Sequence, residues 1–260
     1  MPNPSEHKRT VRRAFTKQAA AYAENASVTD PEWIARLVEA TGVDSSDRVL
    51  EVATGPGHVA FSFGDHCAEV VGLDLTKAPL EIAQEKKRDS ETENVAFIRG
   101  DAEAIPCPAN SFDVVVCRLA LHHVEHPDYV VQEMARVCRP NGTLAVGDLV
   151  VSEHSDRAEY HNTFERLRDP SHVRALSISE LIHVFTEQRI EIDHLRTDSV
   201  VQNVESWLSN AQTPEPRATE AREMIRKDAE EDLSGTQPFW HDDELYFRQL
   251  NGIVAGHLLE

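Results

Sequence analysis

Short apolar runs rich in valine alternate with amphipathic stretches from about residue 30 to residue 150. The apolar runs predict strands buried on both faces, and these are Arg48–Val52, Glu69–Leu73, Val95–Arg99, Phe112–Cys117 and Thr143–Val151. The amphipathic stretches predict helices at Pro31–Thr41, His58–His66, Lys77–Arg88 and Asp128–Cys138. Because strands that alternate with helices form βαβ units, the pattern predicts an α/β fold with a mostly parallel sheet and right-handed crossovers.

Beyond residue 152 the pattern changes. Helices are predicted at His154–Arg168 and Ser177–Glu187, and strands at Arg189–Ser199 and Glu244–Leu258. Between these two strands lies an acidic amphipathic stretch, Ala218–Leu233, whose apolar residues recur every four positions. A helical segment inserted between late strands of an α/β sheet is typical of a lid over a site. A packed excursion without that role is the alternative.

Two helix ends carry recognisable signals. Thr76 stands immediately before the helix predicted from Lys77, where a threonine hydroxyl commonly caps the first backbone N–H groups. Pro140-Asn141-Gly142 follows the helix before the fifth strand, and such a sequence ends a helix. The sequence therefore predicts a Thr76 cap and a sharp stop ahead of the fifth strand.

Charge narrows the choice of partners. The chain has 45 Asp and Glu residues against 26 Lys and Arg residues, a formal net charge of −19. So acidic a chain repels nucleic-acid phosphates and anionic lipid surfaces, which argues against a nucleic-acid partner. It suits a cationic ligand or a small neutral metabolite. The basic run Lys8, Arg9, Arg12, Arg13 and Lys17 is interpreted as a solvated helix face.

The cysteines and the apolar runs favour a cytoplasmic protein. Cys67, Cys107, Cys117 and Cys138 are widely spaced and form no metal-binding motif, so we expect buried, reduced thiols. No run approaches the roughly 18 apolar residues that a membrane span needs, and the first residues lack a secretory signal. We expect no stable membrane insertion, and a homodimer is compatible with the sequence.

The most informative stretch is the run Val49 to His58, in which a predicted strand reaches Glu51 and a turn with Gly55 and Gly57 leads into a helix. Glycine lets the chain reverse tightly and approach a ligand. Asp74 ends the next strand nineteen residues after Gly55, a spacing suited to ribose hydroxyls. Together these features predict a cofactor that contains a nucleoside.

The charge at the strand ends separates two cofactor classes. Gly55, Gly57 and Ala60 also fit the loose dinucleotide pattern G-x-G-x-x-A, so an NAD(P)-dependent oxidoreductase is an alternative. A pyrophosphate does not favour a nearby carboxylate such as Glu51, whereas a ligand with an ammonium and a sulfonium does. With Asp101 after the third strand, acids follow three neighbouring strands, which favours a cationic adenosyl ligand.

On these residues the chain resembles the class I S-adenosylmethionine-dependent methyltransferases, in the UbiE-like small-molecule branch and its YcgJ-like subgroup. The resemblance spans roughly residues 12 to 200. It rests on the following segments: Glu51–Gly57, Asp74, Gly100–Glu103 with Ile105-Pro106, Ser111–Val115, Leu121–His123, Val137–Gly142 and Arg166–Arg174. One departure is visible, since Ala53 stands where the family usually has its first glycine.

The resemblance implies a Rossmann-like fold with a seven-stranded, mostly parallel sheet, an antiparallel last strand and a helical lid insertion. It implies one domain over residues 1–260, with an N-terminal cap helix in 1–30, a cofactor-binding core in 31–152 and a substrate side in 153–260. The lid would occupy about 203–240. The implied cofactor is S-adenosyl-L-methionine, with S-adenosyl-L-homocysteine as product, and the implied partner is a small-molecule methyl acceptor.

The family's cofactor residues carry over onto matching positions. Gly55, Gly57, Glu51 and the Ala53 and Thr54 backbone would lie at the methionine part, with Arg118 beside it and Tyr22 reaching its carboxylate. Asp74 would hold the ribose, Leu75 would flank the adenine, and the adenine would contact Asp101, Ala102 and Glu103. Phe15, Gln18, Ala19 and Tyr22 resemble the family's helix that closes over the cofactor.

Three histidines are candidates for catalysis, although methyl transfer needs a base only if the acceptor must lose a proton. His122 and His123 follow the fourth strand, and either is placed to act as a base, to orient the acceptor or merely to cap a helix. His172 and Asp169 are candidates for a carboxylate–imidazole pair or for a turn lock. No metal site is predicted.

Aromatic residues near the predicted lid are candidates for the wall of an acceptor pocket, and these are Trp207, Phe239 and Trp240. Ordinary packing is the alternative for all three. The sequence thus predicts methyl transfer by in-line displacement to an O, N or C atom of a small molecule. A protein that binds the cofactor without catalysis is a further alternative.

Overall fold

The strands of the first half of the chain form one side of a single sheet in the computed structural model, which describes residues 5–90 and 92–260. Five strands pair in parallel in the order β3-β2-β1-β4-β5. Their bounds are β1 Arg48–Val52, β2 Glu69–Asp74, β3 Val95–Arg99, β4 Phe112–Arg118 and β5 Cys138–Val151. The register places Val52 beside both Leu73 and Cys117, so these strands end at one edge of the sheet.

The last strands complete the sheet. β9 (Glu244–Leu258) runs antiparallel to β5 and lies between β5 and β7 (Ile190–Asn203). Two short strands lie off this path: β6 (Leu176–Ser177) pairs with β5, and β8 (Phe239–His241) pairs with β9. The predicted seven-stranded, mostly parallel sheet with an antiparallel last strand is therefore confirmed, with two short additions.

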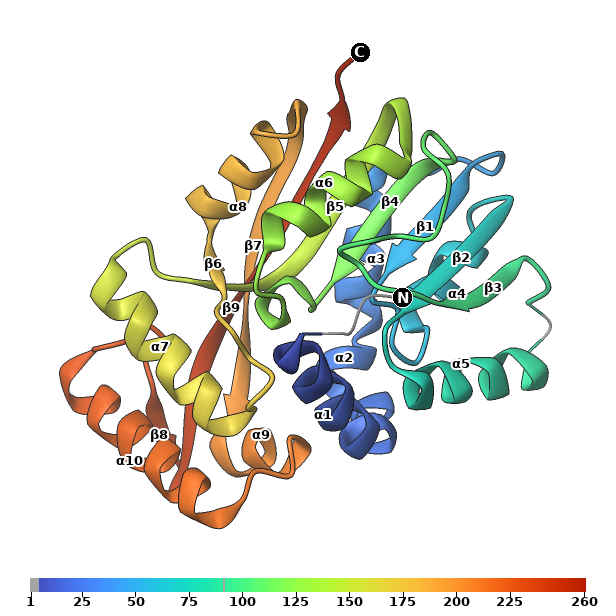
Figure 1. Cartoon of the computed structure of the whole chain (residues 1–260). Coiled ribbons are helices and arrows are strands. Elements are labelled where there is room, and N and C mark those ends of the chain that lie inside the picture. Colours follow the sequence, from blue (N-terminus) through green and yellow to red (C-terminus); the bar gives the residue numbers. More distant parts are fainter. Residues whose placement is uncertain (1–4, 91) are drawn as a thin grey trace.

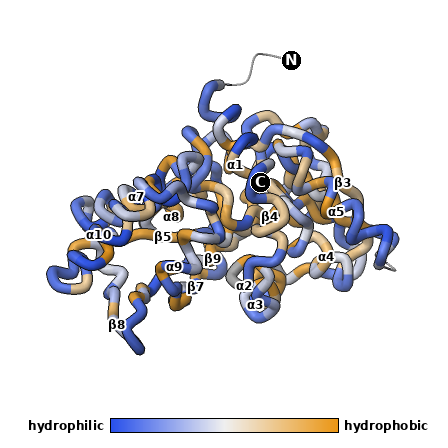
Figure 2. The backbone as a smooth tube through the Cα atoms, turned by 90° about the horizontal axis from the view of Figure 1, so that it is seen from below, coloured by the Kyte–Doolittle hydropathy of each residue, from blue (hydrophilic) through white to orange (hydrophobic). Residues whose placement is uncertain are grey.

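Helices cover both faces of the sheet (Figure 1). On one face, α3 (Pro31–Thr41) and α4 (His58–Gly64) bury side chains such as Trp33 and Phe63. On the other, α6 (Pro127–Val137) and α8 (Ile178–Thr186) bury Met134 and Phe185. Figure 2 shows the resulting distribution, with apolar residues along central strands such as β4 and hydrophilic ones along the outer helix α10 (Glu215–Glu231).

The first helix lies at the edge where the parallel strands end. α1 (Glu6–Ala23) is followed by the short α2 (Ala26–Thr29), and α5 (Lys77–Asp89) packs against α1 and strands β2 and β3. Figure 1 shows α1 in dark blue next to that edge. Residues 1–4 of the predicted cap segment lie outside the described residues. The helix thus stands over the loops that follow the strands.

The segment predicted as a lid packs around a core of its own. α9 (Val204–Asn210) and α10 contact the long outer parts of β7 and β9 and the helix α7 (Ser155–Arg168). Figure 1 shows α7 and α10 side by side beside β9. The core between them contains Phe164, Trp207, Ile225 and Phe247. The segment is therefore well packed, and its role as a lid stays a prediction.

Some local predictions were wrong. The Thr76 side chain does not cap α5; instead its backbone N–H donates to Asp74 Oδ1 at 2.7 Å, so the aspartate organises that turn. The predicted sharp stop is present, since α6 ends at Val137 and β5 begins directly after it, but Pro140-Asn141-Gly142 lies within β5, where Asn141 adopts a φ of +62°. All four cysteines are free thiols, but Cys107 is only half-buried.

No helix within the described residues is long and apolar enough to cross a membrane.

Candidate active site

The turn after β1 is built from backbone conformations that favour glycine. Gly55 and Gly57 have φ values of +52° and +81°, and Ala53 has a φ of +59°. A residue with a Cβ in this region costs roughly 1–2 kcal/mol, so Ala53 occupies a position whose backbone conformation favours glycine. Gly55 N–H donates to Asp74 Oδ2 at 2.9 Å, so the turn is tied to the end of β2.

A cleft opens between this turn and α1, and its empty volume, open solvent included, is about 880 Å³. Eight of the predicted cofactor residues line it, and they are Tyr22, Ala53, Gly55, Asp74, Leu75, Asp101, Ala102 and Glu103. A smaller recess shares Tyr22, Ala53 and Gly55 with it and adds Glu51, Thr54 and Arg118. Gly57 lies apart, because a Cβ there would meet the Phe97 ring at 2.8 Å.

Burial controls the charge of two acids near the ends of β1 and β2, Glu51 and Asp74. Glu51 is only 2% exposed and accepts a hydrogen bond from Thr54 Oγ1 at 2.5 Å. Burial raises the pKa of Glu51 to about 8, so its carboxyl is largely protonated at neutral pH. Burial also raises the pKa of Asp74, against the hydrogen bonds that Asp74 accepts from the Thr76 and Gly55 N–H groups.

Two further residues that were predicted to bind the cofactor, Arg118 and Tyr22, line the smaller recess. The Arg118 guanidinium lies 4.6 Å from the centre of the Trp33 ring and donates to the Val28 carbonyl at 2.6 Å. Tyr22 lines all parts of the cleft, and burial raises the pKa of its hydroxyl to about 12. The phenol therefore remains a neutral donor at physiological pH.

Lys8 bridges α1 and the predicted adenine loop. Its Nζ lies 2.7 Å from Asp101 Oδ2 and 2.5 Å from Glu103 Oε2. The neighbouring His7 Nε2 donates to the His123 carbonyl at 2.7 Å. The prediction of a solvated basic face was therefore wrong for Lys8, because α1 folds back over the strand ends and brings its first turn to the cleft.

A second cavity of about 700 Å³ adjoins the first, and Phe15, Tyr22, Leu119 and His123 line both. Its other walls come mostly from polar residues of α1, α7, α9 and the strands β7 and β9. These are Gln18, Asn25, His122, Glu165, Arg168, Asp169, Gln202, Asn210 and Gln249. The cleft thus has one part lined by most of the predicted cofactor residues and a second part lined mostly by polar residues.

His122 forms a carboxylate–imidazole pair that the sequence did not reveal. Its Nδ1–H donates to Asp148 Oδ1 at 2.5 Å, and Asp148 also accepts from the Leu121 N–H at 2.7 Å. Burial lowers the pKa of His122, but the charge and hydrogen bond of Asp148 outweigh burial and raise it above its usual value. The available signal was one acidic residue inside the apolar run Leu144–Val151.

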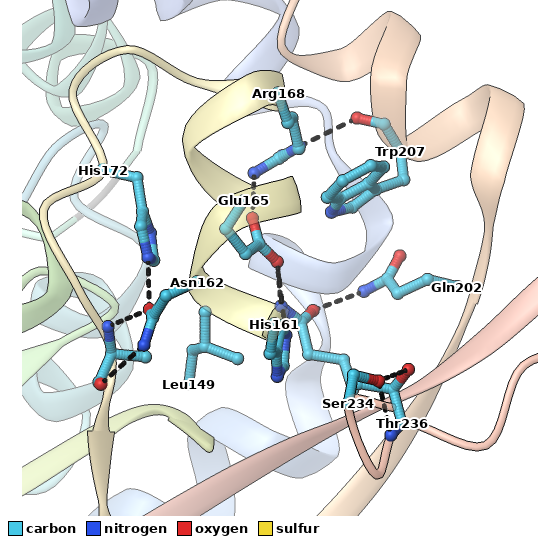
Figure 3. A network of polar contacts seen from close by, with 12 residues as sticks. Leu149, His161, Asn162, Glu165, Arg168, His172, Gln202, Trp207, Ser234 and Thr236 are labelled. Atoms are coloured by element: carbon cyan, nitrogen blue, oxygen red, sulfur yellow. Dashed lines mark hydrogen bonds and ion pairs between the residues drawn. The ribbon is translucent and has the colours of Figure 1, made fainter. Parts of the chain in front are cut away.

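The other two candidate histidines have different surroundings. His123 lines both cavities, lies 3.1 Å from Ser171 Oγ, and has its pKa lowered to about 4 by burial and by the charge of His122. His172 donates through Nε2 to Asn162 Oδ1 at 2.8 Å and lines neither cavity (Figure 3). Burial holds the pKa of His172 well below its usual value.

Of the two alternatives for Asp169 and His172, the structure has the turn lock and not the carboxylate–imidazole pair, since the Ser171 N–H donates to Asp169 Oδ1 at 2.8 Å and the His172 N–H donates to the Asp169 carbonyl at 3.1 Å. Asp169 accepts instead from Ser171 Oγ at 2.6 Å and from Gln18 Nε2 at 3.3 Å, and it faces the second cavity. Among the predicted aromatic wall residues, Trp207 lines that cavity. Phe239 and Trp240 lie on β8 outside both cavities, and Trp240 is 55% exposed.

In a comparison with known protein families, residues 50–146 match a family model described as a methyltransferase domain. The chain is 32% identical over 203 residues to the uncharacterized methyltransferase YcgJ of Bacillus subtilis, which covers 78% of this chain and 80% of that protein. The YcgJ crystal structure superposes with a TM-score of 0.83 at 28% identity, over 88% of this chain and 99% of that one.

A second group of relatives matches only part of the chain. The ubiquinone/menaquinone biosynthesis C-methyltransferase UbiE of Pseudomonas aeruginosa is 36% identical over 118 residues, which is 44% of this chain and 46% of that protein. The chain thus spans about half the length of these quinone-modifying relatives.

Proposed function

Because the chain belongs to the class I S-adenosylmethionine-dependent methyltransferases, we propose that it transfers the methyl group to a small-molecule acceptor bound in the second cavity. Membership of this family removes the NAD(P)-dependent oxidoreductase from the alternatives. The observation that carries the proposal is the shared boundary of the two cavities at Tyr22, Leu119 and His123. A methyl group of a cofactor bound in the first cavity would thereby face an acceptor bound in the second.

The residues of the first cavity fit the cofactor's charge and shape. S-adenosylmethionine supplies a methyl group on a positively charged sulfur. Glu51 would accept from the ammonium, Asp74 would accept from the ribose hydroxyls, and Asp101 would accept from the adenine amino group. The Gly55 Cα leaves room, since a Cβ there would meet only Tyr22, at 3.8 Å. These acids belong to the ends of three adjacent strands, which supports a cationic nucleoside ligand.

Positioning is the main catalytic contribution expected of these walls, because in-line displacement requires the acceptor, methyl and sulfur to be aligned. Tyr22 and Leu119, at the junction, would exclude water there. His122 lies on the acceptor side, where it would take a proton from an acceptor that must lose one. Asp148 holds the proton on Nδ1 and so leaves Nε2 as the basic atom. Asp148 would thus act as a positioning residue.

The proposal is tested in two stages. Calorimetric titration should show binding of S-adenosylhomocysteine and not of NADH, and the reverse result would overturn it. A mass-spectrometric screen for methylated products then identifies acceptors. His122→Ala should retain affinity for S-adenosylhomocysteine and lose at least about tenfold in kcat with acceptors that must be deprotonated. A parallel loss of cofactor affinity would show that His122 only supports the fold.

A further inference from the structure

The walls of the second cavity come largely from a part of the chain that the family model does not match. That model covers residues 50–146, whereas Glu165, Arg168, Gln202, Trp207 and Gln249 follow it in the sequence. Acceptor preference must therefore be argued from these side chains themselves. Four of these five side chains are polar, and a wall of this kind is unsuited to a long apolar chain, because burying polar groups against hydrocarbon costs free energy.

Glu165 is a buried carboxylate with unused capacity to accept hydrogen bonds. It is 1% exposed and accepts from Gln249 Nε2 at 3.2 Å. Arg168 Nη1 and His161 Nε2 lie 3.6 Å and 3.8 Å from it, within ion-pair distance but beyond hydrogen-bond distance (Figure 3). Although burial opposes ionisation, contact with His161 and the charge of Arg168 lower the pKa of Glu165. The carboxylate is therefore charged, and its oxygens keep capacity for further direct hydrogen bonds.

Trp207 offers the complementary group. Its side chain is 2% exposed, and its Nε1 has no hydrogen-bond partner among the described residues. The indole lines the second cavity together with Glu165 and Gln202, and Figure 3 labels all three side chains. Arg168 holds it there, since its Nε donates to the Trp207 carbonyl at 3.0 Å and its guanidinium lies 5.1 Å from the ring centre. A buried unpaired donor is costly, which points to an acceptor supplied by a ligand.

The charged side chains that line the second cavity favour some polar ligands over others. Two carboxylates, Glu165 and Asp169, face the single guanidinium of Arg168. His122 and Asp148 form a pair that adds no net positive charge. The cavity wall is therefore electronegative overall, and it favours a ligand that carries a positive charge.

Building on the proposed function, we propose that the methyl acceptor is a small hydrophilic amine that also carries a hydroxyl or carboxylate. Its ammonium donates to Glu165, and its oxygen accepts from Trp207 Nε1. This class differs from the quinones named for the UbiE relatives, and it assigns the distal wall of the cleft, formed by α7 and α9, to acceptor selection. Glu165 and Trp207 then determine specificity rather than the methyl transfer itself.

The test compares matched probes on the protein saturated with S-adenosylhomocysteine. Serinol and glycerol differ only in an ammonium against a hydroxyl, and hydroquinone represents an uncharged aromatic acceptor. Ligand-observed NMR titration should give serinol at least about tenfold tighter binding than glycerol. Glu165→Gln should abolish that difference, and Trp207→Phe should weaken both polyols. Glu159→Gln, an exposed acid on the same helix, should change nothing.

Several outcomes would overturn the inference: equal binding of serinol and glycerol, preference for hydroquinone, an unaltered preference in Glu165→Gln, or binding of no probe at all. Affinity for S-adenosylhomocysteine and the melting temperature are measured for each variant, so that a folding defect is recognised. If Glu165→Gln is misfolded, the Trp207→Phe titration decides. Failure of the wild-type protein to bind S-adenosylhomocysteine would instead refute the proposed function.

Discussion

Binding of the cofactor should release a proton from Glu51. This carboxyl is buried at the end of β1, and its pKa of about 8 keeps it mostly neutral at pH 7. An ammonium placed beside it favours the ionised form. The perturbation is therefore cofactor binding itself, and the proton lost from Glu51 appears in the buffer.

The pKa determines the size of the effect. A group with a pKa of about 8 is roughly 0.9 protonated at pH 7 and about 0.5 protonated at pH 8, so the expected release falls from ~0.9 to ~0.5 proton. Ionising Glu51 at pH 7 costs about 1.4 kcal/mol of the binding free energy. The affinity for S-adenosylhomocysteine should consequently rise about fivefold between pH 7 and pH 8.

Calorimetry in phosphate and in Tris measures the release, because the apparent binding enthalpy changes with the buffer's ionisation enthalpy in proportion to the protons released. Glu51→Gln should remove the buffer dependence. Glu103→Gln, which changes a carboxylate of the first cavity outside the recess that contains Glu51, should preserve it. A wild-type enthalpy independent of buffer at pH 7, or an unchanged dependence in Glu51→Gln, would refute the reasoning.

Three further predictions address other parts of the cleft. Asp74→Ala should weaken S-adenosylhomocysteine binding at least about tenfold, or 1.4 kcal/mol, because Asp74 also orders the Gly55 turn; an unchanged calorimetric affinity would mean that the ribose acid is misplaced. In the wild type, the raised pKa of His122 places the rise of kcat/KM with pH above pH 6.5. Asp148→Asn should shift this rise to lower pH, because the carboxylate that favours the imidazolium is gone. An unmoved inflection in the pH–rate profile would exclude the pair from catalysis. Lys8→Ala should speed cofactor dissociation in stopped-flow experiments by about two- to fivefold, the effect of a partly exposed ion pair, and equal rates would show that the bridge does not retain the cofactor.

The strand ends could be predicted well because they depend on local pattern. The apolar runs predicted β1 and β3 to the residue; β1 is almost wholly buried, whereas β3 lies at the edge of the sheet and is partly exposed. The glycines and acids that follow them occupy turns whose conformation depends on neighbouring residues. Parallel pairing then brings Gly55 and Asp74 together at one edge. Gly57 shows the limit, because the same turn points it toward Phe97 and away from the cavity.

Pairings between distant residues could not be predicted in this way. Lys8 meets Asp101 across 93 residues, and Gln249 meets Glu165 across 84. Neither contact leaves a periodic signal in one sequence, since each depends on how α1 and β9 pack against the sheet. The sequence signal for Asp148 is one acidic residue within an apolar strand, and nothing in the sequence indicates that His122 is its partner. The acceptor side of the site was therefore less visible than the cofactor side.

The acids at the strand ends also change the meaning of the net charge of −19. Glu51 is largely protonated because it is buried, Asp74 accepts from two backbone N–H groups, and Asp101 is paired with Lys8. The first cavity is thus less negative than its composition suggests. A cationic ligand would exchange these contacts for its own and meet no array of free carboxylates. Because the cofactor replaces contacts that already neutralise these carboxylates, little net charge is left for salt to screen. The affinity for the cofactor should therefore depend only weakly on salt concentration.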